Sequence, residues 1–285
     1  MNKRRLSAFF LSLVLLLSLA ACDLAWLVDS PAAAPGAGVT VHFIDVGQGD
    51  CALVEADGHY LLIDGGERGN EDRVIRYLRA QNIQTLDYVV ATHPHSDHMG
   101  GLAYGVLAAF PVGTVIAPRF SPENAPATQT YEKFLDAVSA LAAEGTKAEY
   151  AKPGKAYPLG GAGFTILGPL REDGQNYNND SVIVRVESQN GAALFMGDAE
   201  KSVEAALAAA YGAGLRADLL KAGHHGSKTS SNEDFLRAVT PEDIVISCGT
   251  GNSYGHPSPE VLERCKALGI QVHRTDIEGT IIMYI

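Results

Sequence analysis

Short apolar runs separated by turn residues dominate the chain from residue 39 to residue 285. Alternating or continuously apolar segments of this kind are typical of β-strands. In the first half they are VTVHFIDVG, CALVEA, YLLIDGG, LDYVVAT, VGTVIAP and GFTILGP. In the second half they are SVIVRVES, GAALFMG, DLLKAG and DIVISCG, followed by closing strands. The first two of the second half predict a hairpin that turns through Gln189, Asn190 and Gly191.

Helical spacing appears between these strands. NEDRVIRYLRAQ, the residues 131–143 and 200–210, NEDFLRAV and SPEVLERCKAL have apolar positions three and four residues apart. The last of these begins with Ser258 as N-cap and Pro259 at its first position, and Gly269 follows its end. Mixed strands with helices on the outer faces indicate a layered α/β architecture in one domain, residues 39–285.

The first 38 residues have a different pattern. Residues 1–21 hold a basic start, an apolar run and small residues before Cys22, which is typical of a secretory signal peptide and too short for a comfortable membrane span. The sequence LAAC, residues 19–22, also resembles the lipobox of bacterial lipoproteins. An ordinary signal peptide that happens to end near a cysteine is the alternative. We expect residues 22–38 to be a lipid-anchored linker and the domain to face outward from the cell membrane.

The net charge of the chain is −11, and removal of the signal peptide leaves 19 basic against 33 acidic residues, about −14. Such an acidic protein is a poor general binder of nucleic acid, because phosphate contacts need Lys and Arg. A local site whose positive charge comes from metal ions is still compatible with this charge.

Four possible metal ligands lie together in HPHSDHMGG, residues 93–101. We place them in a loop after the strand LDYVVAT, where a rigid scaffold usually carries functional groups. His93 and His95 are alternate residues that can point to one position, and Asp97 and His98 can point to a second position beside it. A solvent-facing polar loop would explain one or two such residues but not the whole set.

Further candidates follow or begin other predicted strands. They are Asp180 in NNDS, Asp198 after AALFMG, His224 and His225 in LLKAGHHGS, and His256 in YGHPSPE. Each one alone is an ordinary loop residue. Their recurrence at one edge of the predicted sheets makes a shared site the better interpretation.

The segment THPHSDHMGG resembles the HxHxDH signature of metallo-β-lactamase fold hydrolases. With FIDVGQGD, LLIDGG, NNDS, FMGDAE, LLKAGHHGSKTS and YGHPSPEVL, the chain closely resembles the hydrolase domain of ComEC-type DNA-internalisation competence proteins, and also the related choline-phosphate esterases. The resemblance covers residues 39–285 in unbroken order. It implies an αββα sandwich with two divalent metal ions, Zn or Mn, at one edge between the sheets.

The resemblance also implies roles for these residues. His93 and His95 would bind a first metal, Asp97 and His98 a second, and Asp198 would bridge them. His224 would complete the second site, in preference to His225. Many family members use a further histidine between the HxHxDH motif and the bridging aspartate, but this chain has no histidine from residue 99 to residue 223. Asp180 is the expected substitute, with Asn179 as the fallback.

Catalytic roles are expected for Asp97, as a ligand at the reacting centre, and for His225, Ser227 and His256, which would bind phosphoryl oxygens or protonate the leaving group. These last three could instead be polar residues that support the ligands. The Pro-rich residues 119–130 are the expected lid.

The expected function is that of an exported, membrane-tethered phosphodiesterase or nuclease, in which a hydroxide activated by two metals attacks phosphorus. Its expected partners are a phosphodiester, with single-stranded DNA as the candidate polymer, and the membrane through Cys22. The alternatives are a choline-phosphate esterase, a lactone or thioester hydrolase, or a non-catalytic accessory of DNA uptake.

Overall fold

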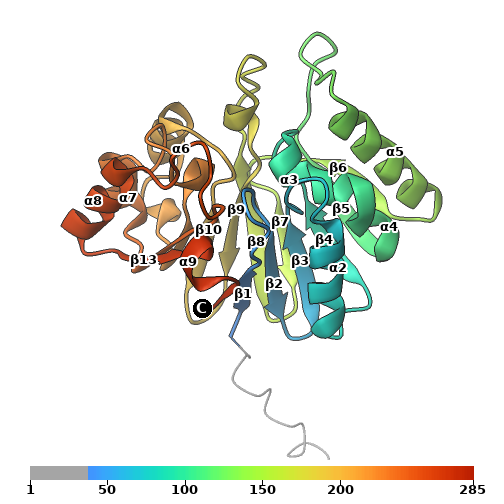
Figure 1. Cartoon of the computed structure of the whole chain (residues 1–285), viewed down its shortest axis with the longest axis horizontal. Coiled ribbons are helices and arrows are strands. Elements are labelled where there is room, and N and C mark those ends of the chain that lie inside the picture. Colours follow the sequence, from blue (N-terminus) through green and yellow to red (C-terminus); the bar gives the residue numbers. More distant parts are fainter. Residues whose placement is uncertain (1–37) are drawn as a thin grey trace, which may run out of the picture. The chain divides into compact units, whose positions relative to one another are not determined.

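Two mixed β-sheets lie face to face in residues 38–285, the part of the chain that this computed structural model describes (Figure 1). Helices cover the outer face of each sheet, so the predicted αββα sandwich in a single domain is confirmed. The expected signal peptide, Cys22 and the linker as far as residue 37 lie outside the described residues. Among the residues 38–285, no helix is long and apolar enough to cross a membrane.

The first sheet has the strand order β14-β1-β2-β3-β4-β5-β6. Strands β3 to β6 run parallel to one another, and the strands before them pair antiparallel. Their bounds are β1 Thr40–Phe43, β2 Ala52–Ala56, β3 His59–Ile63, β4 Leu86–Val90, β5 Val112–Ala117, β6 Lys147–Tyr150 and β14 Ile281–Tyr284.

The second sheet has the order β13-β12-β11-β10-β9-β8-β7. Strands β10 to β13 are parallel, and the predicted hairpin through residues 189–191 joins the antiparallel strands β9 and β10. The bounds are β7 Ala156–Leu159, β8 Ala162–Gly168, β9 Ile183–Glu187, β10 Ala192–Phe195, β11 Leu219–Lys221, β12 Asp243–Ile246 and β13 Gln271–Arg274. The short, largely exposed strand β6 and strand β7 were not predicted from the sequence.

The helices follow the parallel strands. Beside the first sheet they are α2 Glu71–Ala80, α3 Ser96–Gly101, a π-helical turn at Leu102–Val106, α4 Leu107–Ala109 and α5 Gln129–Ala143. Beside the second sheet they are α6 Lys201–Tyr211, α7 Glu233–Val239, α8 Pro259–Leu268 and α9 Thr275–Glu278, with 3₁₀ turns at Tyr177–Asp180, Gly212–Leu215 and Gly223–Gly226. Helix α8 begins and ends where Ser258, Pro259 and Gly269 predicted it.

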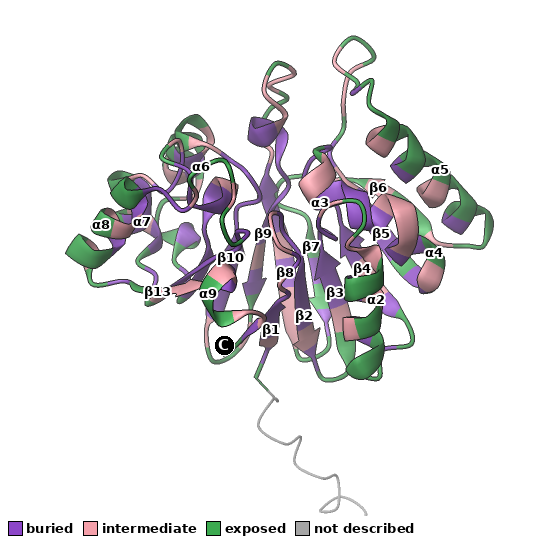
Figure 2. Ribbon diagram, in the orientation of Figure 1, coloured by how far each residue is buried: buried purple, intermediate pink, exposed green. Residues whose placement is uncertain are grey.

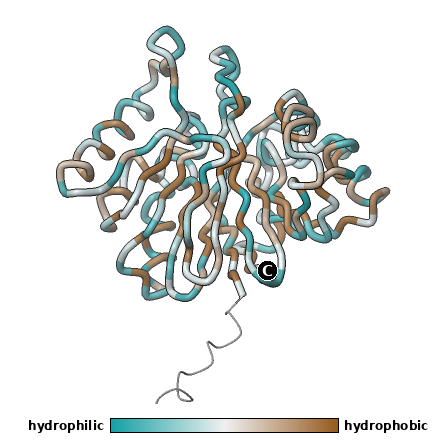
Figure 3. The backbone as a smooth tube through the Cα atoms, turned by 180° about the vertical axis from the view of Figure 1, so that it is seen from behind, coloured by the Kyte–Doolittle hydropathy of each residue, from teal (hydrophilic) through white to brown (hydrophobic). Residues whose placement is uncertain are grey.

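The strands are two-sided because successive side chains point to opposite faces. In β10, Ala193 and Phe195 enter the core between the sheets, and Leu194 enters the core beneath α6 to α8. In β4, Val90 faces the other sheet and Val89 faces the helices. Figure 2 shows both sheets as largely buried, and Figure 3 shows from behind how hydrophobic their strands are. This packing gives a rigid frame from which loops project at the strand ends.

The motif of residues 93–101 is a loop only as far as His95. Helix α3 begins at Ser96, so the prediction that Asp97 and His98 lie in a loop is wrong. The helix is possible here because Gly100 and Gly101 let it touch the chain that follows β3. A Cβ atom on Gly101 would lie 1.9 Å from the carbonyl oxygen of Gly65.

We therefore predict that Gly101→Ala lowers the free energy of unfolding by about 1–3 kcal/mol, the usual cost of overpacking. The backbone of Gly65 cannot move away without disturbing Asp64, which precedes it. Gly214→Ala is the matched control, because its new Cβ would find its nearest neighbour at 3.9 Å. Urea unfolding of both variants measures the difference, and equal stability of the two would contradict this account of α3.

Candidate metal centre

The candidate ligands gather where strands from both sheets end. His93 and His95 follow β4, Asp198 follows β10, and His225 follows β11. The carboxyl ends of parallel strands meet at one edge of a sheet, which is where open α/β proteins place their sites. The edges of the two sheets lie together here, so residues more than a hundred positions apart come into contact.

Three donor atoms are spaced like ligands of one tetrahedral metal ion, and a fourth, from Asp97, contacts one of them. His225 Nε2 lies 3.3 Å from His98 Nε2, 3.2 Å from Asp97 Oδ2 and 3.5 Å from Asp198 Oδ1. His98 Nε2 lies 3.2 Å from Asp198 Oδ1. Four ligands placed tetrahedrally about 2.0–2.2 Å from one ion would be about 3.3–3.6 Å apart. We call Asp97, His98, Asp198 and His225 the second donor group.

A neighbouring group contains the other oxygen of Asp198. His93 Nε2 lies 3.0 Å from His95 Nδ1 and 3.7 Å from Asp198 Oδ2. His224 Nε2 approaches the same oxygen at 3.8 Å. We call His93, His95 and Asp198 the first donor group, with His224 beside it. The two oxygens of one buried carboxylate therefore face two different sets of histidines.

Outer partners turn the imidazoles toward the donor groups. His98 Nδ1 lies 2.8 Å from Asp64 Oδ2, and His225 Nδ1 lies 3.0 Å from the carbonyl oxygen of Ser247. A proton on each Nδ1 atom leaves the lone pair on Nε2, the nitrogen that faces the donor group. Asp198 Oδ1 is buried without a hydrogen-bond partner among residues 38–285. Burial of such a charged oxygen is unfavourable unless a cation binds it, so the residues fit a metal.

The second donor group attracts positive charge. Burial by itself lowers the pKa of His225, but Asp198 and Asp50 outweigh burial and raise that pKa to about 10. Burial opposes the charge on His98 as well, yet Asp198 and other carboxylates raise the pKa of His98 well above its usual value. For His93, burial dominates and the pKa falls well below its usual value. Protons thus occupy positions that a divalent cation would take.

Asp50, which the sequence analysis did not select, lies behind the second donor group. Its Oδ1 is 3.2 Å from His225 Nδ1 and its Oδ2 is 3.9 Å from His98 Nδ1. These are the ring nitrogens opposite the donor atoms, so Asp50 supports the histidines from outside. Lys221 is buried and pairs with Asp50 Oδ2 at 2.7 Å. Asp50 lies in FIDVGQGD, a segment that carried the family resemblance, and this was the only signal for it in the sequence.

The structure places His225, and not His224, in the second donor group. The two residues form a tight turn in which both have left-handed backbone angles, φ +48° for His224 and +54° for His225. The rings therefore diverge, and their centroids are 6.1 Å apart. Thr229 Oγ1 and Glu200 Oε1 lie 3.3 Å and 3.5 Å from His224 Nδ1, which directs Nε2 toward the first donor group.

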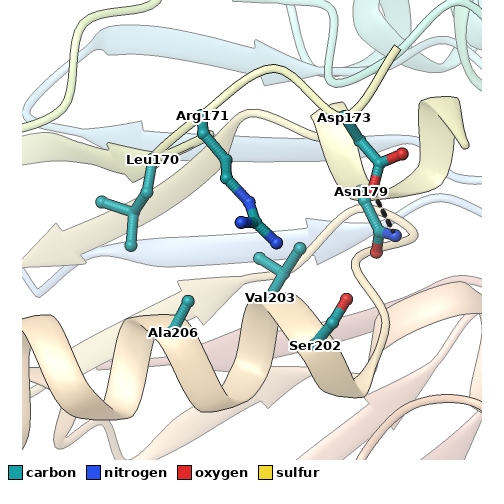
Figure 4. A pocket seen from close by; sticks show the side chains of 7 residues that line it. All are labelled: Leu170, Arg171, Asp173, Asn179, Ser202, Val203 and Ala206. Atoms are coloured by element: carbon teal, nitrogen blue, oxygen red, sulfur yellow. Dashed lines mark hydrogen bonds between the residues drawn. The ribbon is translucent and has the colours of Figure 1, made fainter. Parts of the chain in front are cut away.

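Asp180 and Asn179 do not join the donor groups. Asp180 accepts hydrogen bonds from the backbone N–H groups of Asp173 and Gly174. Asn179 donates to Asp173 and lines a separate pocket of about 220 Å³ with Arg171 (Figure 4). The expected substitution for the missing histidine therefore needs correction, because loop hydrogen bonds hold both side chains away.

The residue of this segment that reaches the centre is Asn178. It lines a cavity of about 210 Å³ that opens onto both donor groups, and its Oδ1 is buried without a hydrogen-bond partner among the described residues. The cavity is also lined by Gln48, His95, Asp97, Asp198, His224, His225, Tyr254 and His256. Neither Asn178 nor Gln48 was selected from the sequence, although both lie in motifs that were.

Of the remaining candidates, His256 lines this cavity and Ser227 does not. Burial first, and then the neighbouring His225 and His224, lower the pKa of His256 to about 4, so its ring is neutral near pH 7. The Ser227 hydroxyl contacts Thr229 Oγ1 at 3.0 Å and accepts from the Thr229 N–H. Ser227 thus supports the turn that carries the two histidines.

The expected lid, residues 119–130, contacts the loop that precedes β9. Ser121 and Asn124 both donate to the carboxylate of Glu172, and the Tyr177 hydroxyl donates to the carbonyl oxygen of Asn124. The Tyr177 ring meets His95 edge-on, with ring centroids 6.2 Å apart. In Figure 1 these two loops rise above the edge where the sheets meet. The loop before β9 therefore contacts the first donor group through Tyr177, and the expected lid packs against that loop.

Comparison with known proteins agrees with this geometry. Residues 44–250 match the family model of the metallo-beta-lactamase superfamily. The chain belongs to this superfamily. The fold of the chain is that of the superfamily, whose members are metal-dependent hydrolases, and its histidine and aspartate donors can hold metal ions.

Competence proteins are among its relatives. The chain is 32% identical over 262 residues to ComE operon protein 3 of Bacillus subtilis, covering 85% of this chain and 32% of the relative. It is 32% identical over 252 residues to competence protein ComA of Neisseria gonorrhoeae, covering 88% and 33%. The chain thus spans about a third of the length of these relatives. The metallo-beta-lactamase fold protein YhfI of Bacillus subtilis is 13% identical with a TM-score of 0.56, covering 87% of this chain and 100% of YhfI, which shows the fold alone.

The donor geometry predicts up to two divalent ions per chain. Asp198→Ala should lose both, because its two oxygens face different groups, whereas His225→Ala should lose the ion of the second group. Asp180→Ala is the matched carboxylate control and should keep both. Elemental analysis after reconstitution with Zn²⁺ or Mn²⁺ measures the content. Full metal in Asp198→Ala would show that this carboxylate is not shared.

Proposed function

We propose that this protein is a metal-dependent phosphodiesterase. The observation that carries the proposal is the shared carboxylate of Asp198, with Oδ1 against His98 at 3.2 Å and Oδ2 against His93 at 3.7 Å. A pair of adjacent metal positions suits in-line displacement at phosphorus, because both the attacking and the leaving oxygen need stabilisation. The relation to competence proteins favours a phosphodiester among the substrates of the superfamily.

We assign the donors to the two metals as follows. The second metal would be held by Asp97, His98, His225 and one oxygen of Asp198. The first would be held by His93, His95 and the other oxygen of Asp198, with His224 in place of the missing histidine. When bound, the two ions would lower the pKa of water and neutralise charge on a phosphoryl oxygen. A histidine in the first site, instead of Asp180, makes the pair softer and favours Zn²⁺ over Mn²⁺.

The residues that line the cavity would bind and orient the ester. Asn178 and Gln48 carry amides that can hydrogen-bond phosphoryl or sugar oxygens. His256 is neutral near pH 7, so we assign it hydrogen bonding to the ester in preference to protonation of the leaving group. Ser227 acts indirectly, through the turn that positions His224 and His225. A cavity of about 210 Å³ suits an extended strand or a small ester better than a duplex, so single-stranded DNA is the polymer we propose.

Other substrates are possible on the same donors. A choline-phosphate ester is a phosphodiester too, and lactones and thioesters are cleaved by metal-activated attack at carbon. A non-catalytic accessory of DNA uptake would not need a cavity that exposes members of both donor groups to a ligand. The intact donor set therefore favours an enzyme.

We predict that metal-loaded protein hydrolyses bis-p-nitrophenyl phosphate and that His95→Ala reduces the rate to that of metal-free protein. His95 is in contact with His93 and lines the cavity, so its loss removes a donor where the ester binds. Release of p-nitrophenolate measures the rate, and Asp180→Ala is the control that should stay active. Rapid hydrolysis of a lactone or a thioester, with no phosphodiester cleaved, would overturn the proposal.

We also propose that the protein is exported and held at the outer face of the cell membrane by lipid on Cys22, as LAAC at residues 19–22 suggests. Cys22→Ala should then release the mature protein from the membrane fraction. One acyl chain binds a membrane only weakly, so anchoring needs the full lipid modification. Fractionation and mass spectrometry of the mature N-terminus provide the test. A mature form that begins elsewhere and is soluble would contradict the anchor.

A further inference from the structure

An exposed aromatic ring stands at the rim of the cavity. Tyr254 lies in the loop between β12 and α8, and 70% of its surface is exposed. One face of its ring is stacked on His256, with centroids 5.7 Å apart and planes inclined by 22°. Both residues line the cavity beside the donor groups. Because one ring face is stacked on His256 and most of the side chain is exposed, the other ring face is free for a ligand.

The loop holds this ring in place. The side-chain amide of Asn252 donates to the carbonyl oxygens of Gly249 and His256 and accepts from the His256 N–H. Gly249 N–H in turn donates to the side chain of Gln48, from the loop before β2. Tyr254 lies between these fixed points. A ligand that stacks on it therefore pays little of the entropy cost of ordering the loop.

The charge of the cavity limits the ligand. Within residues 38–285, no Lys or Arg lines the cavity. Lys221, which is nearby, is buried and already paired with Asp50. A phosphate monoester or a diphosphate carries extra negative charge that nothing in this lining neutralises. The cavity thus suits the singly charged phosphate of a phosphodiester at the donor groups, with an uncharged part of the substrate, such as a base, against the rest of the lining.

We propose that the open face of Tyr254 is a stacking platform for the base of a nucleoside phosphodiester whose phosphate lies at the two donor groups. This inference rests on the proposed function and names its substrate class. Base stacking on an aromatic side chain tolerates any base, so a single exposed ring is enough for this contact. A quaternary ammonium group such as choline would be enclosed by several rings. Tyr254 is the one tyrosine, phenylalanine or tryptophan ring among the described residues that line the cavity, so we favour a base.

Three p-nitrophenyl phosphodiesters test the proposal with one leaving group and different second substituents: thymidine, choline and methyl. In metal-loaded protein, kcat/KM for the thymidine ester should exceed that for the methyl ester. Tyr254→Ala should reduce this ratio about tenfold to a hundredfold, and Tyr254→Phe should retain it. Tyr284→Ala, at an equally exposed tyrosine on β14, is the matched control and should leave the ratio unchanged. Loss confined to the choline ester would overturn the proposal.

Binding of a thymidine dinucleoside phosphorothioate, measured by calorimetry, gives a second readout that does not depend on turnover. Tyr254→Ala should weaken binding about tenfold to a hundredfold, while Tyr254→Phe and Tyr284→Ala bind as the wild type does. Binding that depends on Tyr254 without hydrolysis of any ester would contradict the phosphodiesterase and support the platform. If Tyr254→Ala hydrolyses the esters and binds the dinucleoside as the wild type does, the phosphodiesterase would be supported and the platform overturned.

Discussion

The buried carboxylate of Asp198 sets the central constraint on this protein. Its two oxygens face His98 and His93, and its side chain is only 3% exposed. A carboxylate and several imidazoles at this depth are costly unless charge and hydrogen bonds are satisfied together. The surroundings meet that requirement with outer partners: Asp64 for His98, and the Ser247 carbonyl for His225. A second buried carboxylate, Asp50, is neutralised by Lys221.

The same constraint explains the left-handed backbone of His224 and His225 in the segment GHHG, residues 223–226. Two consecutive non-glycine residues with positive φ are unusual, and strain of this kind persists only where the surrounding structure enforces it. Adjacent histidines in a regular strand would point to opposite faces of the sheet, and only one could reach the centre. The left-handed turn instead directs His225 to one donor group and His224 toward the other. Thr229 contacts the His224 ring and Ser227 contacts Thr229, and together they stabilise this arrangement.

The sequence was sufficient for the layers, for most strands and helices, and for the gathering of donors at one edge. Alternation along strands such as β10 is a local property, and so is the helical spacing of α2. The direction of a side chain at the end of a loop is not a local property, because it depends on contacts with distant residues. The carboxylate of Asp180 is bound by the N–H groups of Asp173 and Gly174, and no sequence pattern distinguishes that arrangement from metal binding. The choice between His224 and His225 depended on φ angles for the same reason.

The missed residues have a common cause. Asn178 and Asp50 become significant only when loops from the two sheets meet, because each acts on a partner far away in the sequence. Helix α3 was missed because it is short and contains two glycines, which disfavour a helix unless close packing requires them. Gly100 and Gly101 are there for contact with residues 65–68, a tertiary reason that local propensity does not contain.

The charge distribution links ligand and cation in one further way. The chain has a net charge of −11, and the described residues that line its candidate cavity are aspartates, histidines, amides and Tyr254, without Lys or Arg. An anionic ester would therefore meet a repulsive surface if the donor groups were empty, and an attractive one if they held divalent cations. Binding of the ester and binding of the cations must then strengthen each other by the same factor, because linkage is reciprocal. An acidic protein can in this way act on a phosphodiester only when it is loaded with metal, without a basic groove that would also retain other nucleic acids.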